Sequence, residues 1–268
     1  MISRLLDPAN AVSRLVDLSV LMPCQDEANV VERNVMETMR TLRERYQGSF
    51  EVILVDDGST DGTYERAEAL TQALPELKVL RIPMNGGKGN ALRKAFEHAS
   101  GSVVCFLDGD LDIHANHITP YVRLLETGFA DVVVASKRHP QSQIDYPWER
   151  RVLSLAYQTL VRALFGLRVL DTQAGIKVFR REVLERVLPL GLVKRYAFDA
   201  ELLVLAHLRG YRIIEMPITM KFHEKYGSGV SLRAIYQMFL DTLGVFYRLH
   251  VTKYYERGIP RADLRGGR

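Results

Sequence analysis

Three aspartates at alternate positions, Asp108, Asp110 and Asp112, directly follow the apolar run Val103–Leu107. Carboxylates this close together repel one another unless a cation lies among them. On an extended segment alternate residues point to the same side, so the three side chains would share one face. Mg²⁺ and Mn²⁺ prefer carboxylate oxygens and keep coordination positions open for substrate phosphates. The pattern therefore predicts a site for Mg²⁺ or Mn²⁺ formed by these three aspartates.

Other acidic motifs fit this segment less well. An EF-hand loop that began at Asp108 would have Gly at its sixth position and Glu at its twelfth, where this chain has Ile113 and Thr119. A phosphatase with an aspartate nucleophile also follows an apolar strand with Asp-x-Asp, but normally has Thr or Val at the position of Asp112. A solvated, Asp-rich turn needs no cation and is the remaining alternative.

Two more polar segments follow apolar runs. Pro23–Asn29 (PCQDEAN) comes after Leu18–Met22, and Asp56–Thr63 (DDGSTDGT) comes after Glu51–Val55. In a parallel sheet the carboxyl ends of the strands meet at one edge, where ligands bind. We therefore expect acidic side chains to converge there, where they would accept hydrogen bonds from a nucleobase or a ribose.

A Gly-rich segment, Asn85–Leu92 (NGGKGNAL), precedes a helical pattern. It lacks the spacing of a P-loop, so it does not predict a nucleoside triphosphate site. Its single lysine, Lys88, stands at the start of the expected helix and could reach an anion.

The elements that would position these residues alternate along the first half of the chain. This alternation predicts an α/β fold, Rossmann-like, with a mostly parallel central sheet flanked by helices. The strands expected there are Leu18–Met22, Glu51–Val55, Lys78–Ile82, Val103–Leu107 and Asp131–Ala135. The helices expected between them are Glu27–Tyr46, Gly62–Ala73, Gly89–Ala99 and Ile118–Thr127.

After Arg138 the alternation ends. The expected helices are Glu149–Leu167, Phe198–Arg209 and the long amphipathic Leu232–Val251, and strands are expected within Asp171–Phe179 and Tyr211–Lys221. No repeat or linker interrupts the sequence, so we expect one domain over residues 1–256 and a disordered basic tail over 257–268.

Composition narrows the class of protein. The chain has 268 residues, 47% of them apolar and 25% charged, as in ordinary globular proteins. A net charge of +4 does not indicate a nucleic-acid partner, although it is compatible with anionic substrates or a membrane surface. Cys24 and Cys105 lie in apolar runs and are expected to be buried free thiols in a reducing compartment. The sequence shows neither a signal peptide nor a spanning segment, so we expect a cytoplasmic protein.

Taken together, these segments resemble family 2 glycosyltransferases of the GT-A fold. LSVLMPCQDEANV, VILVDDGSTDGT, MNGGKGNALRKAF, VVCFLDGDLD and VVVASKR follow one another at that family's spacing. In the second half DTQAGIKVFRREV, RYAFDAELLVLAHLRGYRIIEMPI and GSGVS are similar to the dolichyl- and polyprenyl-phosphate glycosyltransferases, most of all to those that transfer glucose. The resemblance covers nearly the whole chain, and its specificity lies in the combination of motifs.

The resemblance implies a nucleotide-sugar donor, a divalent metal and inversion at the anomeric carbon. It assigns the base and ribose pocket to Pro23, Gln25, Glu27, Asp56 and Asp57. It assigns donor binding also to Lys88, Asp108 and Arg138, the metal to Asp108, Asp110 and Asp112, and catalysis to Asp110 and Asp199. The metal would neutralise the charge that builds up on the leaving diphosphate.

The acceptor decides the role of Asp199. A sugar hydroxyl needs a general base, whereas a phosphate monoester is already anionic at neutral pH and needs cationic side chains to position it. Asp199 matches the family's general base, and as a helical acid it would equally be favoured near a helix N-terminus. The expected acceptor contacts are Arg150, Arg151, Gln173, Lys177 and Arg180.

Membrane contact is one of two interpretations of the C-terminal end. Residues 232–250 carry an apolar stripe at helical spacing, and arginines and a lysine follow it. Such a helix beside a basic tail is typical of peripheral attachment to the inner face of a membrane. Packing of the stripe on the domain, or a homodimer interface, is the alternative.

The sequence thus predicts transfer of a hexose, glucose from UDP-glucose in particular, onto a polyprenyl phosphate. A soluble hydroxyl acceptor with Asp199 as the base is one alternative, with either a UDP-sugar or a GDP-sugar as donor. A non-catalytic protein that binds nucleotide sugars is the other.

Overall fold

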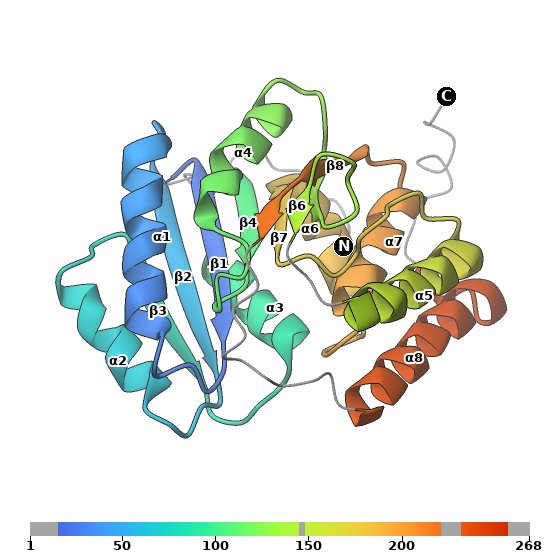
Figure 1. Cartoon of the computed structure of the whole chain (residues 1–268), viewed down its shortest axis with the longest axis horizontal. Helices are drawn as coiled ribbons and strands as arrows, with labels where there is room; N and C mark the ends of the chain where they lie inside the picture. The colour runs from blue at the N-terminus through green and yellow to red at the C-terminus, as the bar shows by residue number, and fades with distance from the viewer. Residues whose placement is uncertain (1–15, 145–147, 221–231, 257–268) are drawn as a thin grey trace, which may run out of the picture.

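The computed structural model describes residues 16–144, 148–220 and 232–256, except for the side chains of 148–152 and 232–233. Its strands are β1 (Leu18–Cys24), β2 (Phe50–Asp57), β3 (Leu77–Ile82), β4 (Val103–Leu107), β5 (Val132–Ser136), β6 (Gln143–Ile144), β7 (Ile176–Arg180), β8 (Ile213–Pro217) and β9 (Thr219–Met220). Its α-helices are α1 (Val31–Arg45), α2 (Thr63–Ala69), α3 (Lys88–His98), α4 (Ile118–Glu126), α5 (Trp148–Phe165), α6 (Arg181–Val187), α7 (Phe198–Leu208) and α8 (Leu232–Phe246). Figure 1 shows their arrangement.

Seven strands form the central sheet in the order β3-β2-β1-β4-β7-β5-β8. Neighbouring strands are parallel except at β7, which runs antiparallel to both β4 and β5. The short strands β6 and β9 pair in a separate parallel ribbon. The predicted mostly parallel α/β fold is confirmed, and the one reversed strand is an addition that the alternation of elements did not indicate.

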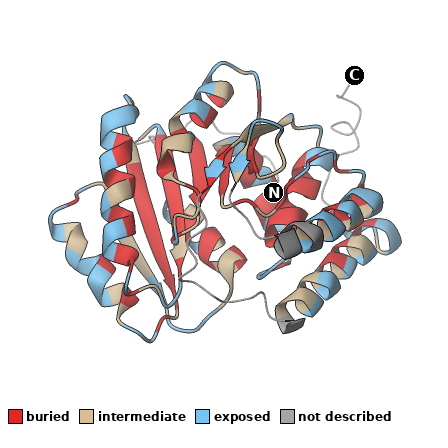
Figure 2. Cartoon of the chain, in the orientation of Figure 1, coloured by how far each residue is buried: buried red, intermediate tan, exposed pale blue. Residues whose placement is uncertain are grey.

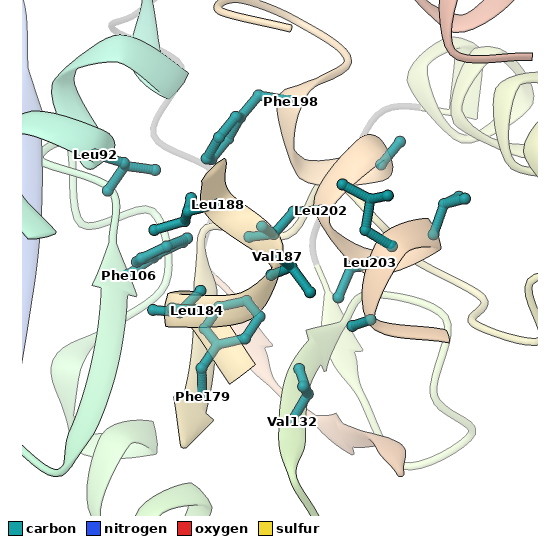
Figure 3. Packing of buried hydrophobic residues seen from close by; sticks show 14 of the residues in the cluster. Leu92, Phe106, Val132, Phe179, Leu184, Val187, Leu188, Phe198, Leu202 and Leu203 are labelled. Atoms are coloured by element: carbon teal, nitrogen blue, oxygen red, sulfur yellow. The ribbon is translucent and has the colours of Figure 1, made fainter. Parts of the chain in front are cut away.

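The inner strands of the sheet are buried on both faces, as Figure 2 shows by their red colour, whereas the outer strands β3 and β8 are partly exposed. Alternate strand residues point to opposite faces, which explains the continuous apolar runs of β1, β2 and β4. One face packs on α1, α2 and α4. The other packs on α3, α6 and α7 and reaches α5 and α8, with Phe106, Phe179 and Phe198 at its centre (Figure 3).

The predicted elements are present, with small shifts at their ends. The first helix begins at Val31 rather than Glu27 because Gln25–Val30 forms the connection that leaves β1. The last helix ends at Phe246 and continues as a π-helical turn, Tyr247–Val251. Cys24 and Cys105 are buried free thiols, as expected. The expected tail, 257–268, and the GSGVS segment lie outside the described residues.

The strand directions bring the functional segments to one edge. β1, β2, β4 and β5 all end there, and the antiparallel β7 begins there, because Ile176 pairs with Leu107. The segment that precedes β7, DTQAG, therefore joins the acidic strand ends at this edge.

At the opposite edge a buried glutamate stabilises the sheet. Glu51 Oε1 accepts hydrogen bonds from Ser19 Oγ (2.6 Å) and Ser100 N (2.7 Å), and its Oε2 is paired with Lys78 Nζ (2.6 Å). Burial raises the pKa of Glu51, but these bonds outweigh burial, so the pKa lies below its ordinary value of 4.5.

We expect the Glu51→Gln variant to unfold with a free energy lower by about 1–3 kcal/mol at neutral pH, since buried partners lose a charged acceptor. The folded-state pKa is the lower one, so the contribution of Glu51 is complete above the unfolded-state pKa and is lost as the pH falls through the folded-state pKa. Urea unfolding of both proteins at neutral and acidic pH measures this, with Glu44→Gln on exposed α1 surface as the control. If the difference in free energy of unfolding between the wild type and Glu51→Gln is as large at acidic pH as at neutral pH, this prediction is wrong.

Candidate active site

The three aspartates after β4 lie on a tight turn and not on the extended segment that the sequence predicted. Leu111 N donates to Asp108 O (3.3 Å), and Asp112 N donates to Asp110 Oδ1 (3.1 Å). Leu111 has φ of 54°, in the left-handed region that L-residues other than Asn and Asp rarely adopt. The three carboxylates still face a common cavity because the turn, rather than strand alternation, brings them there.

That cavity has a volume of about 80 Å³ and is lined by Asp108, Asp110, Asp112, Ile113, Lys137, Gln173, Gly175 and Met220. Gln173 Nε2 is buried without a hydrogen-bond partner among the described residues, so it has a donor available for a ligand oxygen. Gly175 permits the close approach of Asp108, since a Cβ at this position would lie 2.7 Å from Asp108 Oδ2.

The carboxylates at this edge crowd one another. Burial, together with the charges of Asp110 and Asp108, raises the pKa of Glu27 to about 8. Desolvation and the charges of Asp108 and Asp112 raise the pKa of Asp110 to about 7, although its side chain reaches solvent. Glu27 Oε2 is also buried without a partner among the described residues. Ionising all of these carboxylates together is therefore unfavourable unless a further cation lies among them.

One cation already lies among these acids, the ammonium of Lys88. It is 2.7 Å from Asp108 Oδ1 and 3.2 Å from Asp199 Oδ2, and Lys177 Nζ lies 2.9 Å from Asp199 Oδ1. Two carboxylates and two ammonium groups thus alternate in a chain: Asp108, Lys88, Asp199 and Lys177. Burial raises the pKa of Asp199, but the two lysines outweigh it and hold that pKa below its ordinary value.

These ion pairs bear on the assignments of Lys177 as an acceptor contact and of Asp199 as a base. Lys177 is 1% exposed at its side chain and also donates to Ala174 O (2.7 Å), so it supports Asp199 from beneath and is not a free acceptor-binding cation. Asp199, with both oxygens paired to lysines, is poorly suited to take a proton from a hydroxyl.

The described residues do not form a preassembled metal cage. Within the described part of the chain, no three His, Cys, Asp or Glu side chains are grouped closely enough to hold a metal ion by themselves. Mg²⁺ commonly binds through one or two carboxylates together with substrate phosphates, and does not need a full protein cage. The uncompensated carboxylates of Asp110 and Glu27 fit a cation that arrives with a diphosphate.

The residues assigned to the nucleoside lie at the ends of β1 and β2. Asp56 is fully buried, and burial raises its pKa. Contacts with Ser59 and with the Arg81 guanidinium, 3.9 Å away, partly offset this rise. Asp57 accepts hydrogen bonds from Gly86 N (2.9 Å) and Gly87 N (2.7 Å). Asp57 therefore holds the Gly-rich loop in place, and its predicted nucleoside contact stays a prediction.

Two other members of that predicted pocket are more open. Pro23 is half-buried within β1, and Gln25 is exposed, with its Nε2 3.4 Å from Asp26 Oδ2. Asp26 in turn joins the β1 and β2 loops, because its Oδ1 accepts a hydrogen bond from Thr60 N (3.0 Å). The two loops thus form one continuous rim.

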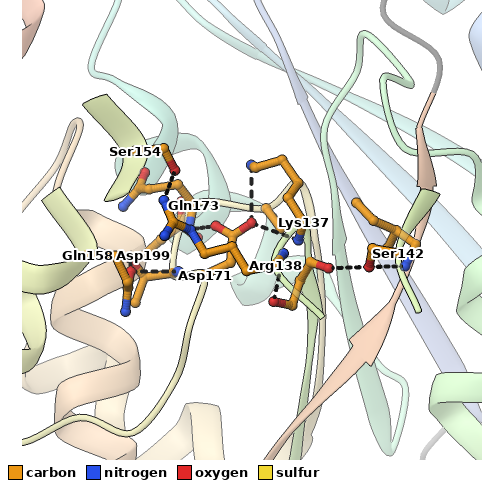
Figure 4. A network of polar contacts seen from close by, with 12 residues as sticks. Lys137, Arg138, Ser142, Ser154, Gln158, Asp171, Gln173 and Asp199 are labelled. Carbon is orange, nitrogen blue, oxygen red and sulfur yellow. Dashed lines mark hydrogen bonds and ion pairs between the residues drawn. The ribbon is translucent and has the colours of Figure 1, made fainter. Parts of the chain in front are cut away.

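Arg138 lies in a polar network beside the aspartate cavity, shown in Figure 4. Its guanidinium donates to Ser154 Oγ on α5 (3.1 Å). Buried Asp171 organises the rest, accepting hydrogen bonds from Lys137 N and Gln173 N (3.0 Å each) and pairing with Lys137 Nζ at 3.3 Å. The network fixes Lys137 and Gln173 on the cavity wall.

The structure separates one predicted acceptor residue from the site. Arg180 is the last residue of β7 and pairs with Val103, at the opposite edge of the sheet, because β7 is antiparallel. There its side chain contacts Asp131 and the carbonyl groups of Ala130 and Leu125. The side chains of Arg150 and Arg151 lie outside the described residues, so their assignment stays a prediction.

Several residues of the site were not singled out from the sequence. Asp171, Gly175 and Lys137 became evident only when the antiparallel β7 placed DTQAG beside the aspartate turn. The motif itself was visible, but only Gln173 in it was expected to act. Nothing in the sequence around Ser154 indicates its contact with Arg138, because the two residues lie in separate elements 16 positions apart.

A solved structure shows the same architecture. Glucosyl-3-phosphoglycerate synthase from Mycobacterium tuberculosis, in complex with Mn²⁺, UDP-glucose and phosphoglyceric acid, superposes with a TM-score of 0.62 at 25% identity, covering 86% of this chain and 80% of that one. The fold and the acidic edge define a glycosyltransferase of the GT-A type. Residues 19–188 match the family described as Glycosyl transferase family 2. The chain belongs to that family, as its motifs predicted.

Named relatives extend the match along the chain. Glycosyltransferase AglD of Haloferax volcanii is 33% identical over 212 residues, which are 79% of this chain and 34% of that protein. This chain thus spans about a third of that relative's length. Dolichyl-phosphate beta-glucosyltransferase of Saccharomyces cerevisiae is 29% identical over 234 residues, covering 80% of this chain and 69% of that protein.

Proposed function

We propose that this glycosyltransferase moves a hexose, glucose from UDP-glucose in particular, onto a polyprenyl phosphate. The observation that carries the proposal is the pairing of Asp199 with both Lys88 and Lys177. A hydroxyl acceptor would need Asp199 as a base, whereas a phosphate acceptor is already ionised at neutral pH. Similarity to a dolichyl-phosphate glucosyltransferase supports the same acceptor class.

In this proposal the described residues divide into two groups. Asp56 and the rim formed by the β1 and β2 loops receive the nucleoside, and Lys88 approaches the diphosphate from the Gly-rich loop. Lys137 and Gln173 line the aspartate cavity and would contact the transferring sugar and the acceptor phosphate, with Arg138 in the adjoining network. Arg150 and Arg151 would add cationic charge on the acceptor side.

Mg²⁺ or Mn²⁺ belongs to the proposal as well, held by Asp108, Asp110 and Asp112, which line one cavity. The crowded carboxylates support this, and the related synthase was solved with Mn²⁺. When bound, such an ion stabilises the negative charge that develops on a departing diphosphate. The chain's own contribution is to orient the donor and to keep Asp108 aligned through Lys88.

A soluble hydroxyl acceptor is the second candidate, favoured by the phosphoglyceric acid in the related synthase complex. It predicts that Asp199 changes its pairing when the acceptor binds. The polyprenyl-phosphate proposal requires no such change.

Contact with the inner face of a membrane would bring the enzyme to a lipid-borne acceptor. No helix in the described ranges combines the length and the apolarity needed to cross a bilayer. α8 instead exposes Tyr236, Phe239, Leu240 and Leu243 to solvent, while Val245 packs inward. Such a face is suited to interfacial binding, and a homodimer would cover it equally.

Calorimetric titration of UDP and GDP, each with and without Mg²⁺, tests the donor half of the proposal. We expect UDP to bind more tightly than GDP, and its affinity to rise at least about tenfold when Mg²⁺ is present, since the ion relieves repulsion between the diphosphate and the aspartates. Tighter binding of GDP than of UDP, or a UDP affinity that does not change when Mg²⁺ is added, contradicts the proposed donor.

A further inference from the structure

A second cavity, of about 470 Å³, lies behind the Gly-rich loop. It is lined by Asn85, Gly86, Leu192, Val193, Lys194, Arg195, Leu240, Asp241, Gly244 and Arg248. It shares no lining residue with the aspartate cavity. Its volume lies within the range of about 300–1,000 Å³ that small-molecule sites occupy.

Positive charge dominates the wall of this cavity. The lining residues include three basic side chains, Lys194, Arg195 and Arg248, and a single acidic one, Asp241. Arg248 is also paired with buried Glu201 at 3.2 Å, which offsets its charge from behind the wall. Lys194 is exposed and makes no ion pair with any described residue. With Glu201 counted, the surroundings keep a surplus of positive charge that favours an anion.

Asp241 gives the cavity a second kind of contact. Its carboxylate receives a hydrogen bond from the Ala197 backbone, yet its Oδ2 is buried without a partner among the described residues. A buried carboxylate oxygen without a donor is costly, so this atom suits a ligand that carries an O–H or N–H group. A simple anion would satisfy the lysine and arginines and be repelled by Asp241.

The rim of the cavity is apolar. Leu192 and Leu240 line it and are 47% and 46% exposed. Phe239 and Leu243 extend this exposed apolar surface along α8. Figure 1 shows α8 at the periphery of the molecule, packed beside α5. If the polar head of a ligand entered the cavity, the rest of that ligand would therefore lie along the apolar face of α8.

We propose that this cavity binds a glycerophosphate group, a phosphate ester with free hydroxyls. The phosphate would lie against Lys194 and Arg195, and a hydroxyl would donate to Asp241 Oδ2. Free glycerol phosphate and the headgroup of phosphatidylglycerol share this chemistry, and the apolar rim favours the lipid. The two cavities share no lining residue, so the proposal does not rest on the proposed reaction.

Titration of glycerol 3-phosphate and of inorganic phosphate into the whole protein tests the proposal. We expect glycerol 3-phosphate to bind more tightly than phosphate, and Lys194→Ala to weaken it about tenfold, the effect of losing one charge-assisted contact. Asp241→Leu should abolish the preference for the glycerol ester while phosphate binds no more weakly. Lys94→Ala, an exposed lysine paired with Glu97 outside the cavity, is the control.

Flotation with vesicles distinguishes the two sources. At matched vesicle charge, a larger fraction of the protein should float with phosphatidylglycerol vesicles than with phosphatidylserine vesicles. The Lys194→Ala variant should lose that difference, and its melting temperature should not change. Binding of the soluble ester alone would also support the site and assign it a free metabolite. Absence of both, or equal binding by Lys194→Ala and the wild type, overturns the proposal.

Discussion

Asp110→Asn should lower the rate of hexose transfer about a hundred- to a thousand-fold, the size of effect seen when a group that stabilises transition-state charge is lost. Asp110 lies in the middle of the aspartate turn, and burial and its acidic neighbours raise its pKa to about 7. A negative group held at such an electrostatic cost has its use when a cation binds. Replacing it removes a ligand and leaves the turn's backbone unchanged.

The measurement is steady-state transfer together with UDP binding in the presence and absence of Mg²⁺. The variant should lose the metal-dependent part of UDP affinity and keep the metal-independent part. Its melting temperature should not fall, because relief of carboxylate repulsion favours the fold. Glu97→Gln, at an exposed position of α3, is the matched control. A variant with wild-type turnover would rule out the metal-binding role of Asp110.

Asp199→Asn should reduce the free energy of unfolding by about 3–5 kcal/mol, the cost of leaving a buried charge without its partner. Lys177 lies beneath Asp199 at 2.9 Å and is 1% exposed, so water cannot replace the lost carboxylate. Denaturant unfolding measures the loss. A destabilisation below about 1 kcal/mol, the value typical of exposed pairs, would contradict the buried-pair description.

The double variant Asp199→Asn/Lys177→Met separates stability from catalysis. It removes both buried charges, and we expect it to regain most of the lost stability. A general base contributes about a hundred- to ten-thousand-fold to rate, so transfer to a phosphate acceptor that falls by less than about tenfold would exclude that role for Asp199. A larger loss in a stable double variant would favour the hydroxyl acceptor.

The sequence predicted much of this arrangement because its signals are local. Apolar runs that end in acids identify strand ends, and in a parallel sheet those ends share an edge. Asp56, Asp108 and Lys88 were therefore placed correctly at one edge, and the buried state of both cysteines followed from their apolar surroundings.

What the sequence did not predict depends on non-local pairing. Strand direction is not encoded in an apolar run, and the reversed β7 moved Arg180 to the far edge while it brought Gly175 to Asp108. The ion pairs of Asp199 join residues far apart in the chain, so the sequence left its role open and did not indicate that two lysines would pair with it. The left-handed conformation of Leu111 likewise has no sequence signal, since the residue is not glycine.

The most direct test of the account is transfer of labelled glucose from UDP-glucose, with Mg²⁺, to a polyprenyl phosphate presented in detergent or vesicles. The account predicts labelled product that partitions into organic solvent, and no such product when the prenyl chain ends in a free alcohol. Label that stays in the aqueous phase, or that moves to a soluble hydroxyl acceptor in preference to the prenyl phosphate, would contradict it.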